Sequence, residues 1–301
     1  MSERQDRIAA LEYDYDGRYK ERVDACNVCG AAGAPVEVAR RDRYEYAATT
    51  VLCRRCGLGY LSPRLTAEEY GQFYAKVYRP LVSAYHGRRI DAETVQVEQR
   101  EYARALAAFL EPWLEERPRT VLDVGGSTGV VAGAFVECFG AAATVLDPAP
   151  DELAVAEAAG METIASGAEE FDPEGRTWDL VLLCQTIDHL LDLRGTLDAL
   201  RRVTAPGGRA FVDVLDIGFM LRRRGRIEGA VKIDHPYYLT ANTARACFSL
   251  AGLRSVAERL SHDGHWGFVL EPAEPAEPDW REVGGSADEL LEAIWSRRAA
   301  A

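Results

Sequence analysis

Four cysteines near the start of the chain have the residue type and spacing of metal ligands. They form two Cys-x-x-Cys pairs, Cys26 with Cys29 and Cys53 with Cys56, and a glycine follows each pair. Two residues between paired cysteines let both thiolates face one ion from a tight turn, and the glycine permits the open backbone that such a turn needs. Two such turns complete a tetrahedral all-sulfur site that is closed to substrate. We therefore predict a structural zinc site in a zinc-ribbon module.

Two other interpretations of these thiols stay open: a redox pair, or four unrelated thiols. A redox pair would require a thioredoxin-like βαβ context, which the surrounding sequence lacks. The other three cysteines, Cys138, Cys184 and Cys247, lie singly in apolar stretches and are expected to be small buried side chains. Because the total of seven cysteines is odd and no apolar secretion signal is expected, a disulfide framework is disfavoured.

A second set of residues could bind a small ligand. The run from Val121 to Ala132 reads as a strand, a glycine-rich turn and the start of a helix, and such glycines let a ligand approach the backbone closely. Asp123 precedes the glycines at the strand end, where it can meet a ligand ammonium. The turn lacks Gly-x-Gly-x-x-Gly spacing, so it is less suited to binding the pyrophosphate of a dinucleotide. Asp147 ends the next strand and suits an acid that grips ribose hydroxyls.

The two aspartates and the glycine turn can bind one ligand only if their strands end at the same edge of a sheet. Short apolar runs predict five strands, at 120–123, 143–146, 162–165, 178–184 and 209–215. Helical stretches are predicted at about 91–111, 129–139, 151–159, 192–203 and 240–251. Strands that alternate with helices favour an α/β fold with a doubly wound, mostly parallel sheet. Two last strands joined through Asp263-Gly264 predict an antiparallel hairpin, for seven strands in all.

The chain divides by composition into four segments. We expect a zinc-ribbon module at 1–62, an aromatic connector or lid at 63–90, a ligand-binding α/β domain at 91–271, and a Pro/Glu linker with a C-terminal helix (about 286–298) at 272–301.

The charge of the chain is unevenly distributed. There are 35 Lys and Arg against 48 Asp and Glu, a net charge of −13. Residues 1–90 are slightly basic, with 15 against 12, whereas residues 91–301 are strongly acidic, with 20 against 36. An acidic body repels a phosphate backbone, so nucleic acid is disfavoured as a partner. No apolar run reaches the roughly 18 residues of a membrane span, so a cytoplasmic protein without a membrane partner is expected; the oligomeric state is not indicated.

Four segments in the α/β domain resemble the successive motifs of class I S-adenosylmethionine-dependent methyltransferases. They are Val121–Val131, Val145–Pro148, Trp178–Cys184 and Arg202–Arg209. The resemblance covers about residues 95–271 and implies a Rossmann-like methyltransferase fold with S-adenosylmethionine as cofactor. The four-cysteine module ahead of this domain is similar to that of bacterial methyltransferases acting on sugars or other secondary metabolites.

The resemblance also implies roles for single residues around the cofactor. Asp123, Gly125 and Gly129 would line its methionine end, in a loop with Gly126 and Ser127. Asp147, followed by Pro148, would bind the ribose, Ala168 and Glu169 would flank the adenine, and Cys184 and Gln185 would lie on the cofactor floor. Ser127 stands where many members of this family have glycine, which predicts a slightly altered loop.

Two histidines are candidates for a catalytic base. Methyl transfer from a sulfonium is an in-line displacement that needs no metal, and the enzyme supplies alignment and, for a hydroxyl or carbon acid, a base. Asp188 and His189 follow the fourth strand directly, where the resemblance implies an acid–His pair facing the acceptor. Neighbouring residues on a helix do not face each other, so the sequence does not decide whether Asp188 and His189 are in direct contact. A His189 that only shapes the cofactor pocket is the alternative interpretation. His235 is the second candidate base.

The long segment 216–239 is the predicted acceptor-binding region, since members of the resembling family usually bind the acceptor there. Arg222 and Arg224 could grip an anionic acceptor such as the diphosphate of a nucleotide sugar. Tyr237 and Tyr238 are further candidates, and Tyr78 of the connector could belong to a lid. A solvated charge run and aromatic packing are the alternative interpretations.

The sequence therefore predicts a methyltransferase for a small-molecule acceptor: a sugar, a nucleotide sugar or a secondary-metabolite intermediate, methylated on oxygen or carbon. One alternative is an RNA base methyltransferase with a zinc module, which the acidic body disfavours. The other is a non-catalytic binding protein with a cofactor fold, which the presence of Asp123 and Asp147 disfavours.

Overall fold

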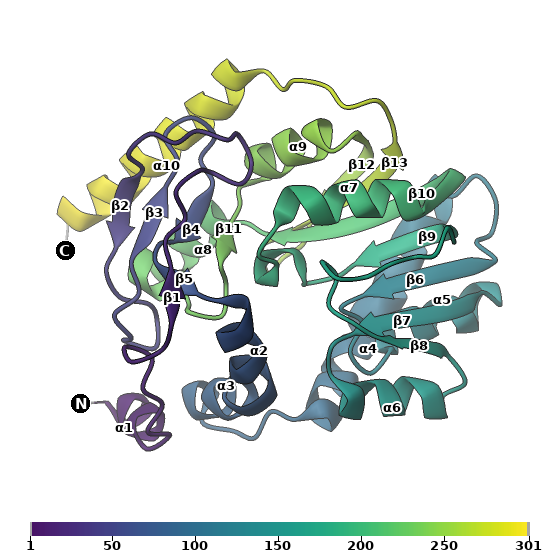
Figure 1. The fold of residues 1–301 in the computed structure, drawn as a ribbon, viewed down its shortest axis with the longest axis horizontal. Coiled ribbons are helices and arrows are strands. Elements are labelled where there is room, and N and C mark those ends of the chain that lie inside the picture. The colour runs from purple at the N-terminus through teal and green to yellow at the C-terminus, as the bar shows by residue number, and fades with distance from the viewer. Residues whose placement is uncertain (1, 300–301) are drawn as a thin grey trace. The chain divides into compact units, whose positions relative to one another are not determined.

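The computed structural model describes residues 2–299, with the backbone alone at Ala92, Glu93 and Val95, and divides into two compact units (Figure 1). Unit 1 consists of residues 1–91, 215–246 and 278–301, and unit 2 of residues 92–214 and 247–277. Unit 1 thus takes residues from each of the four segments predicted by composition, whose boundaries remain a prediction. The ends of the predicted terminal segments, Met1, Ala300 and Ala301, lie outside the described residues.

Unit 2 is built on a seven-stranded sheet with the order β12-β13-β10-β9-β6-β7-β8. Its strands are β6 (Thr120–Val124), β7 (Ala142–Asp147), β8 (Glu162–Ala165), β9 (Trp178–Leu183), β10 (Thr204–Leu215), β12 (Leu253–Leu260) and β13 (His265–Pro272). The five strands from β10 to β8 pair in parallel, and β12 pairs antiparallel with β13. The predicted α/β fold with its terminal hairpin is confirmed.

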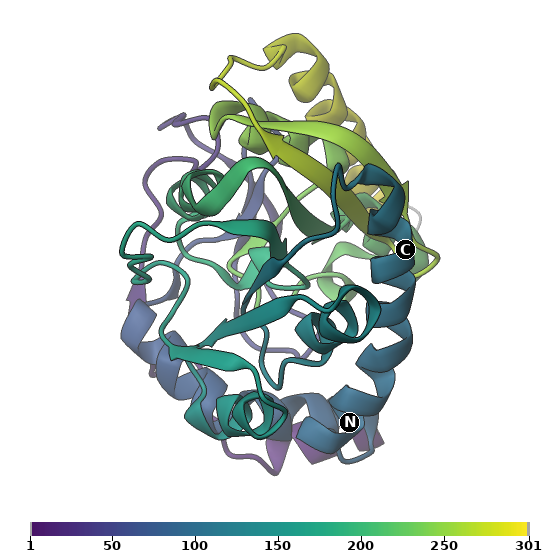
Figure 2. The ribbon, with the colours of Figure 1, turned by 90° about the vertical axis from the view of Figure 1, so that its right-hand side faces the viewer.

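The helices of unit 2 cover this sheet. They are α4 (Ala92–Leu110), α5 (Val130–Phe139), α6 (Pro150–Ala158) and α7 (Leu193–Val203), with 3₁₀ turns η1 (Glu111–Trp113) and η2 (Ile187–His189). Helices α4 and α5 lie beside each other (Figure 2) and bury Leu106 and Phe135 against Leu180 and Phe211 of the sheet. Because the core holds five strands parallel, their carboxyl ends meet at one edge, where doubly wound folds bind ligands.

Unit 1 contains a four-stranded antiparallel sheet with the order β11-β4-β3-β2. Its strands are β2 (Val36–Ala39), β3 (Thr50–Leu52), β4 (Gly59–Leu61) and β11 (Tyr237–Tyr238), and a second sheet pairs β1 (Lys20–Glu21) with β5 (Arg64–Leu65). Strands β2 and β3 lie between the two cysteine pairs. The sequence did not predict β11, by which segment 216–239 joins the sheet of the cysteine module.

The helices of unit 1 are α1 (Glu3–Ala9), α2 (Ala67–Lys76), α3 (Tyr78–His86), α8 (Ile217–Arg224), the 3₁₀ turn η3 (Ile227–Gly229) and α10 (Trp280–Ala299). The division between the units falls inside α9 (Ala241–Leu250). Helix α10 begins earlier than the predicted residue 286. Asp279 makes this start possible, because its carboxylate accepts the Arg281 amide at 2.9 Å and its carbonyl accepts the Val283 amide.

Among the described residues, no helix combines the length and apolarity that crossing a membrane requires.

Candidate functional site

The four predicted zinc ligands converge in unit 1. The ligand atoms of Cys26, Cys29, Cys53 and Cys56 all lie within 4.8 Å of one another, with Sγ separations of 3.4 Å between Cys26 and Cys56 and 3.5 Å between Cys29 and Cys53. Thiolates bound at about 2.3 Å to a tetrahedral ion lie roughly 3.8 Å apart, so the cluster has the size of a zinc site. All four thiols are free of disulfide bonds.

The two cysteine turns have the same backbone geometry. The amides of Gly30 and Gly57 donate to the carbonyls of Cys26 and Cys53 at 2.8 and 2.9 Å. Both glycines have left-handed φ angles, +67° and +73°, which a side chain would disfavour. The structure therefore brings together the four residues that the spacing argument selected, and this donor set would fit a structural zinc ion.

The glycine-rich turn of unit 2 follows β6 and begins α5. Gly125 and Gly129 have φ angles of +71° and +73°, and a Cβ on Gly125 would lie 2.6 Å from the side chain of Thr186. A Cβ on Gly126 would lie 2.7 Å from the Asp123 carboxyl carbon. A side chain at either position would therefore force Thr186 or Asp123 to shift. The turn is therefore a backbone cradle above the strand ends, and it fits the close approach of a nucleoside cofactor.

Ser127 and Asp147 are connected across this cradle. Ser127 has a φ angle of +51°, which explains why glycine is favoured at this place in the resembling family. Its amide donates to Asp147 Oδ2 at 2.9 Å, and its hydroxyl donates to Glu152 of α6. Asp147 Oδ1 accepts the amide of Ala149 at 2.9 Å, next to Pro148. A carboxylate has about four acceptor positions, so Asp147 can hold the loop and still accept ribose hydroxyls.

Asp123 is buried below the glycine turn. Its side chain is 1% exposed, and Oδ2 accepts the Ala132 amide of α5 at 3.2 Å. Burial is the main cause that raises the pKa of Asp123 to about 7; the nearby Asp147 and Asp213 contribute in the same direction, and the Ala132 amide opposes them. A ligand cation near this carboxylate would favour its ionised form.

A third acid lies at the same edge and was missed by the sequence analysis. Asp213, near the end of β10, is level with Cys184, because Val212 pairs with Leu183. Its Oδ1 accepts the Gln185 amide, and its Oδ2 accepts the hydroxyl of Tyr102, on α4, at 2.8 Å. The signal in the sequence was weaker than for Asp123 and Asp147, because Asp213 lies inside the predicted strand 209–215, two residues before its end.

The predicted floor and adenine residues lie in the loops that follow these strands. Cys184 is half-buried and Gln185 is exposed with a φ of +53°, so the chain turns sharply after β9. Ala168 and Glu169 lie after β8, and Glu169 Oε1 accepts the amides of Leu191 and Asp192 at 2.5 and 2.6 Å. Glu169 thus holds the loop between β9 and α7. Its role beside an adenine remains a prediction.

The candidate catalytic pair Asp188 and His189 forms the 3₁₀ turn η2 in this loop. The His189 amide donates to the Thr186 carbonyl at 2.9 Å, and Thr186 packs over Gly125. Asp188 is 7% exposed and His189 is half-buried. The structure therefore places His189 on a loop fixed on one side by the cradle and on the other by Glu169.

The other candidate base, His235, lies in unit 1 and is 4% exposed. Its Nε2 is 3.6 Å from Asp234 Oδ2, which also lies 3.1 Å from the Lys232 ammonium. Tyr237 and Tyr238 are buried in β11. The Tyr238 hydroxyl donates to the Lys232 carbonyl and accepts its amide, and the Tyr237 hydroxyl accepts from Arg64 at 2.9 Å. Both tyrosines serve the packing of unit 1, and their acceptor-binding role stays a prediction.

The remaining predicted acceptor residues are more exposed. Arg222 and Arg224 lie in the last turn of α8, where cations favour the helix C-terminus. Both side chains are exposed, and the Arg222 guanidinium lies 6.0 Å from the Phe219 ring. Tyr78 begins α3 and is half-buried, with its ring 5.5 Å from that of Tyr74.

One expectation about the isolated cysteines was wrong. Cys247 is buried and Cys184 half-buried, but Cys138 is exposed. Cys138 lies one residue before the end of α5, on the side of the helix that the sheet does not cover. Local apolarity cannot distinguish the two sides of a helix without its partners.

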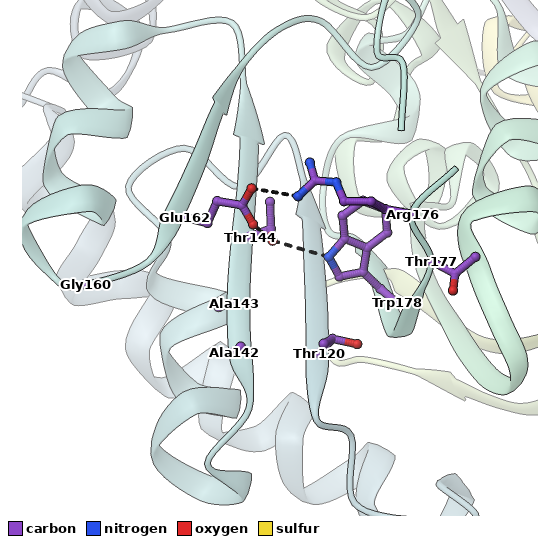
Figure 3. A pocket seen from close by; sticks show the side chains of 9 residues that line it. All are labelled: Thr120, Ala142, Ala143, Thr144, Gly160, Glu162, Arg176, Thr177 and Trp178. Atoms are coloured by element: carbon purple, nitrogen blue, oxygen red, sulfur yellow. Dashed lines mark hydrogen bonds and ion pairs between the residues drawn. The ribbon is translucent and has the colours of Figure 1, made fainter. Parts of the chain in front are cut away.

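A hollow of about 500 Å³ lies in unit 2 at the amino ends of the strands (Figure 3). Its polar side chains bind one another: Arg176 pairs with Glu162 at 2.7 Å, and Trp178 Nε1 donates to Thr144 at 3.3 Å. This is the sheet edge opposite to the glycine cradle. We assign it no ligand.

Comparisons with known proteins agree with this geometry. The model of a family described as a methyltransferase domain matches residues 95–258, more than half of the chain. The chain is 30% identical over 102 residues to a ubiquinone biosynthesis O-methyltransferase of Methylocella silvestris. That match covers 32% of this chain and 40% of the relative, so the chain spans less than half of the relative's length.

Solved structures show the same fold. The PH0226 protein of Pyrococcus horikoshii OT3 has a TM-score of 0.50 and 19% identity, covering 58% of this chain and 91% of that one. The mitomycin 7-O-methyltransferase MmcR has a TM-score of 0.51 and 17% identity, covering 68% of this chain and 60% of that one. At these identities the likeness shows the fold alone. With the family match, the seven-stranded sheet and the glycine cradle together, the chain belongs to the methyltransferase domain family.

Proposed function

We propose that this protein is an S-adenosylmethionine-dependent methyltransferase whose acceptor is a small molecule. The observation that carries the proposal is the backbone cradle of Gly125 and Gly126 between two strand-end acids, Asp123 and Asp147. Bound S-adenosylmethionine would supply an electrophilic methyl group on its sulfonium. Asp123 would bind the ammonium of the methionine end, and Asp147 the ribose hydroxyls. Cys184 and Gln185 would form the floor, with Ala168 and Glu169 beside the adenine.

The acceptor we propose is a sugar, a nucleotide sugar or a secondary-metabolite intermediate, methylated on oxygen or carbon. His189 would accept the proton from the attacking group, because it lies on a fixed loop just beyond a strand end at the ligand-binding edge. His235 is the alternative base. Zinc would have a structural role only, since four cysteines complete its coordination and leave no open position for an acceptor. A cytoplasmic location and no nucleic-acid partner belong to the same proposal.

Calorimetry and a transfer assay test this proposal. The full chain should bind S-adenosylmethionine and should transfer a labelled methyl group to a member of a panel of nucleoside-diphosphate sugars, free deoxysugars and phenols. Transfer to RNA instead, with binding that weakens steeply as salt increases, would favour the RNA methyltransferase. Binding of cofactor without transfer to any member of the panel or to RNA would favour a non-catalytic protein. Absence of cofactor binding would contradict the proposal altogether.

Asp147→Ala is expected to weaken S-adenosylmethionine binding by about 1.5–3 kcal/mol, because it removes charge-assisted hydrogen bonds to the ribose. Since Asp147 also accepts the Ser127 amide, part of this loss will reflect a looser cradle. Asp147→Asn keeps one acceptor oxygen and should lose less. Calorimetry measures both, with Glu157→Gln on the exposed face of α6 as the control. Unchanged affinity in Asp147→Ala would mean that the ribose lies elsewhere.

Asp123 predicts how cofactor affinity depends on pH. Because burial raises the pKa of Asp123 to about 7, the carboxyl is largely protonated at lower pH and ionises as pH rises. Only the ionised form attracts the ligand ammonium, so affinity should rise roughly tenfold between about pH 5.5 and pH 7. Asp123→Asn should bind more weakly and show a much smaller rise. An equally steep rise in the variant would assign the pH dependence to another group.

A further inference from the structure

Asp213 is a buried carboxylate at the cofactor edge to which the proposed reaction gives no role. Its side chain is 2% exposed, and it accepts hydrogen bonds from the Tyr102 hydroxyl and the Gln185 amide. Within residues 2–299 it forms no ion pair. Two neutral donors therefore hold the buried carboxyl group in place, and neither of them would neutralise its charge when it is ionised.

The other charged groups around Asp213 are mostly acidic. Burial raises the pKa of Asp213, and Asp188 of the β9–α7 loop raises it further; the two hydrogen bonds and the positive field of His265 on β13 act in the opposite direction. Asp123 lies near the end of β6, two strands away, and Asp213 contributes in turn to the raised pKa of Asp123. A cation bound among these groups would relieve their mutual repulsion.

We propose that the Asp213 carboxylate makes the cofactor site prefer a positively charged sulfonium over a neutral thioether. This inference rests on the proposed function. S-adenosylmethionine and S-adenosylhomocysteine share the adenosine, the ammonium and the carboxylate, and they differ at the sulfur by one methyl group and one positive charge. Asp123 and Asp147 would act on groups common to both ligands, so they cannot separate the two by charge. Asp213 lies two strands away from Asp123 along the sheet, level with the proposed floor residues Cys184 and Gln185.

Asp213→Asn removes this charge without removing the hydrogen bonds. The amide oxygen can accept from Gln185, and the amide nitrogen can donate to the Tyr102 hydroxyl. Tyr102→Phe is the matched control, since it removes one hydrogen bond and keeps the ionisable carboxyl group; it is compared at high pH because this hydrogen bond lowers the pKa of Asp213. Asp213 therefore acts here as a specificity-determining residue, and a merely structural role would affect both ligands equally.

The experiment is calorimetric titration of the full chain with each ligand at about pH 8, where Asp213 is most ionised. We expect Asp213→Asn to weaken S-adenosylmethionine binding about three- to tenfold and S-adenosylhomocysteine binding less than about twofold. Tyr102→Phe should leave the ratio of the two dissociation constants within about twofold of the wild type. Glu157→Gln, which removes an exposed charge on α6, should leave both constants unchanged.

Equal weakening of both ligands by Asp213→Asn would overturn the inference and leave a structural role. So would unchanged binding of both. If Asp213→Asn does not fold, Asp213→Ser is measured instead, because its hydroxyl is a neutral acceptor for the Gln185 amide. A wild-type protein that binds neither ligand contradicts the proposed function itself, and this inference with it. Binding of both ligands with an unshifted ratio contradicts the inference alone.

Discussion

Cys56→Ala is expected to abolish stoichiometric zinc binding and to release the C-terminal helix α10 from its packing. Removing one of four thiolates leaves an open coordination position, and zinc binding to such sites contributes about 10–16 kcal/mol in small peptides. That is comparable to the whole stability of a domain, about 5–15 kcal/mol, so the cysteine module should lose its cooperative folding.

The release of α10 follows from contacts within unit 1. The Cys56 carbonyl accepts the Thr243 hydroxyl at 2.7 Å, and a Cβ on Gly57 would lie 3.2 Å from Ala287 of α10. The Arg55 guanidinium lies 4.4 Å from the ring of Trp280, at the start of the same helix. A cysteine turn that no longer holds its ion loses the surface against which α10 packs.

Elemental analysis and limited proteolysis measure these effects. Wild-type protein should contain one zinc per chain, and Cys56→Ala should contain much less and be cleaved within residues 280–299. Calorimetry should find that unit 2 of the variant still binds S-adenosylmethionine, since its strands and cradle come from other residues. Cys138→Ala is the control, because Cys138 is an exposed thiol outside the cluster. Freshly purified, reduced wild-type protein without zinc would contradict the prediction.

The sequence predicted the parts of the fold whose signals are local. Alternating apolar strands and helices located the five parallel strands, although β10 begins at Thr204 and not at 209, and two glycine-flanked cysteine pairs marked the four thiols that the structure brings together. The glycine turn could also be predicted, because the left-handed φ angles of Gly125 and Gly129 favour glycine, and glycines are visible in the sequence.

Contacts between segments that are distant in the chain could not be predicted from the sequence. Strand β11 has only two residues and pairs with β4, about 175 positions earlier in the chain, so no periodicity marks it. Cys138 lies in an apolar helix whose covered side depends on the sheet it packs against. The surroundings of Asp213 could not be predicted either, because its hydrogen bonds come from Tyr102 on a helix and Gln185 after another strand. Each of these features depends on tertiary neighbours.

In the candidate site, too, residues with a local signal were predicted and contacts between distant segments were not. Asp123 and Asp147 were found because each stands next to its own turn, whereas Glu152 and Glu169 act on loops distant in sequence. Glu169 was predicted to flank an adenine, and in the structure its carboxylate accepts hydrogen bonds from the amides of Leu191 and Asp192. This holds the loop that carries His189. A residue predicted for ligand binding thus also positions the candidate base.

His189→Ala is expected to lower the rate of methyl transfer by about 10²–10⁴-fold, the usual contribution of a positioned base, on an acceptor found by the panel assay. Affinity for S-adenosylmethionine should change little, because two contacts made by other residues hold the loop: the Thr186 side chain against Gly125, and the Glu169 carboxylate on the amides of Leu191 and Asp192. Added imidazole should restore part of the rate of the variant, since it can enter the space of the missing side chain and accept the proton.

Two further histidine variants make the assignment specific. His262→Ala, in the exposed turn between β12 and β13, should retain full activity and controls for the loss of a histidine in unit 2. His235→Ala tests the other candidate. If it loses activity while His189→Ala does not, the base belongs to segment 216–239, and its partner there is Asp234, 3.6 Å away. If neither variant loses activity, the acceptor is already nucleophilic. The enzyme then accelerates transfer by alignment, and strand-end residues such as Asp123 and Asp147 become the main determinants of rate.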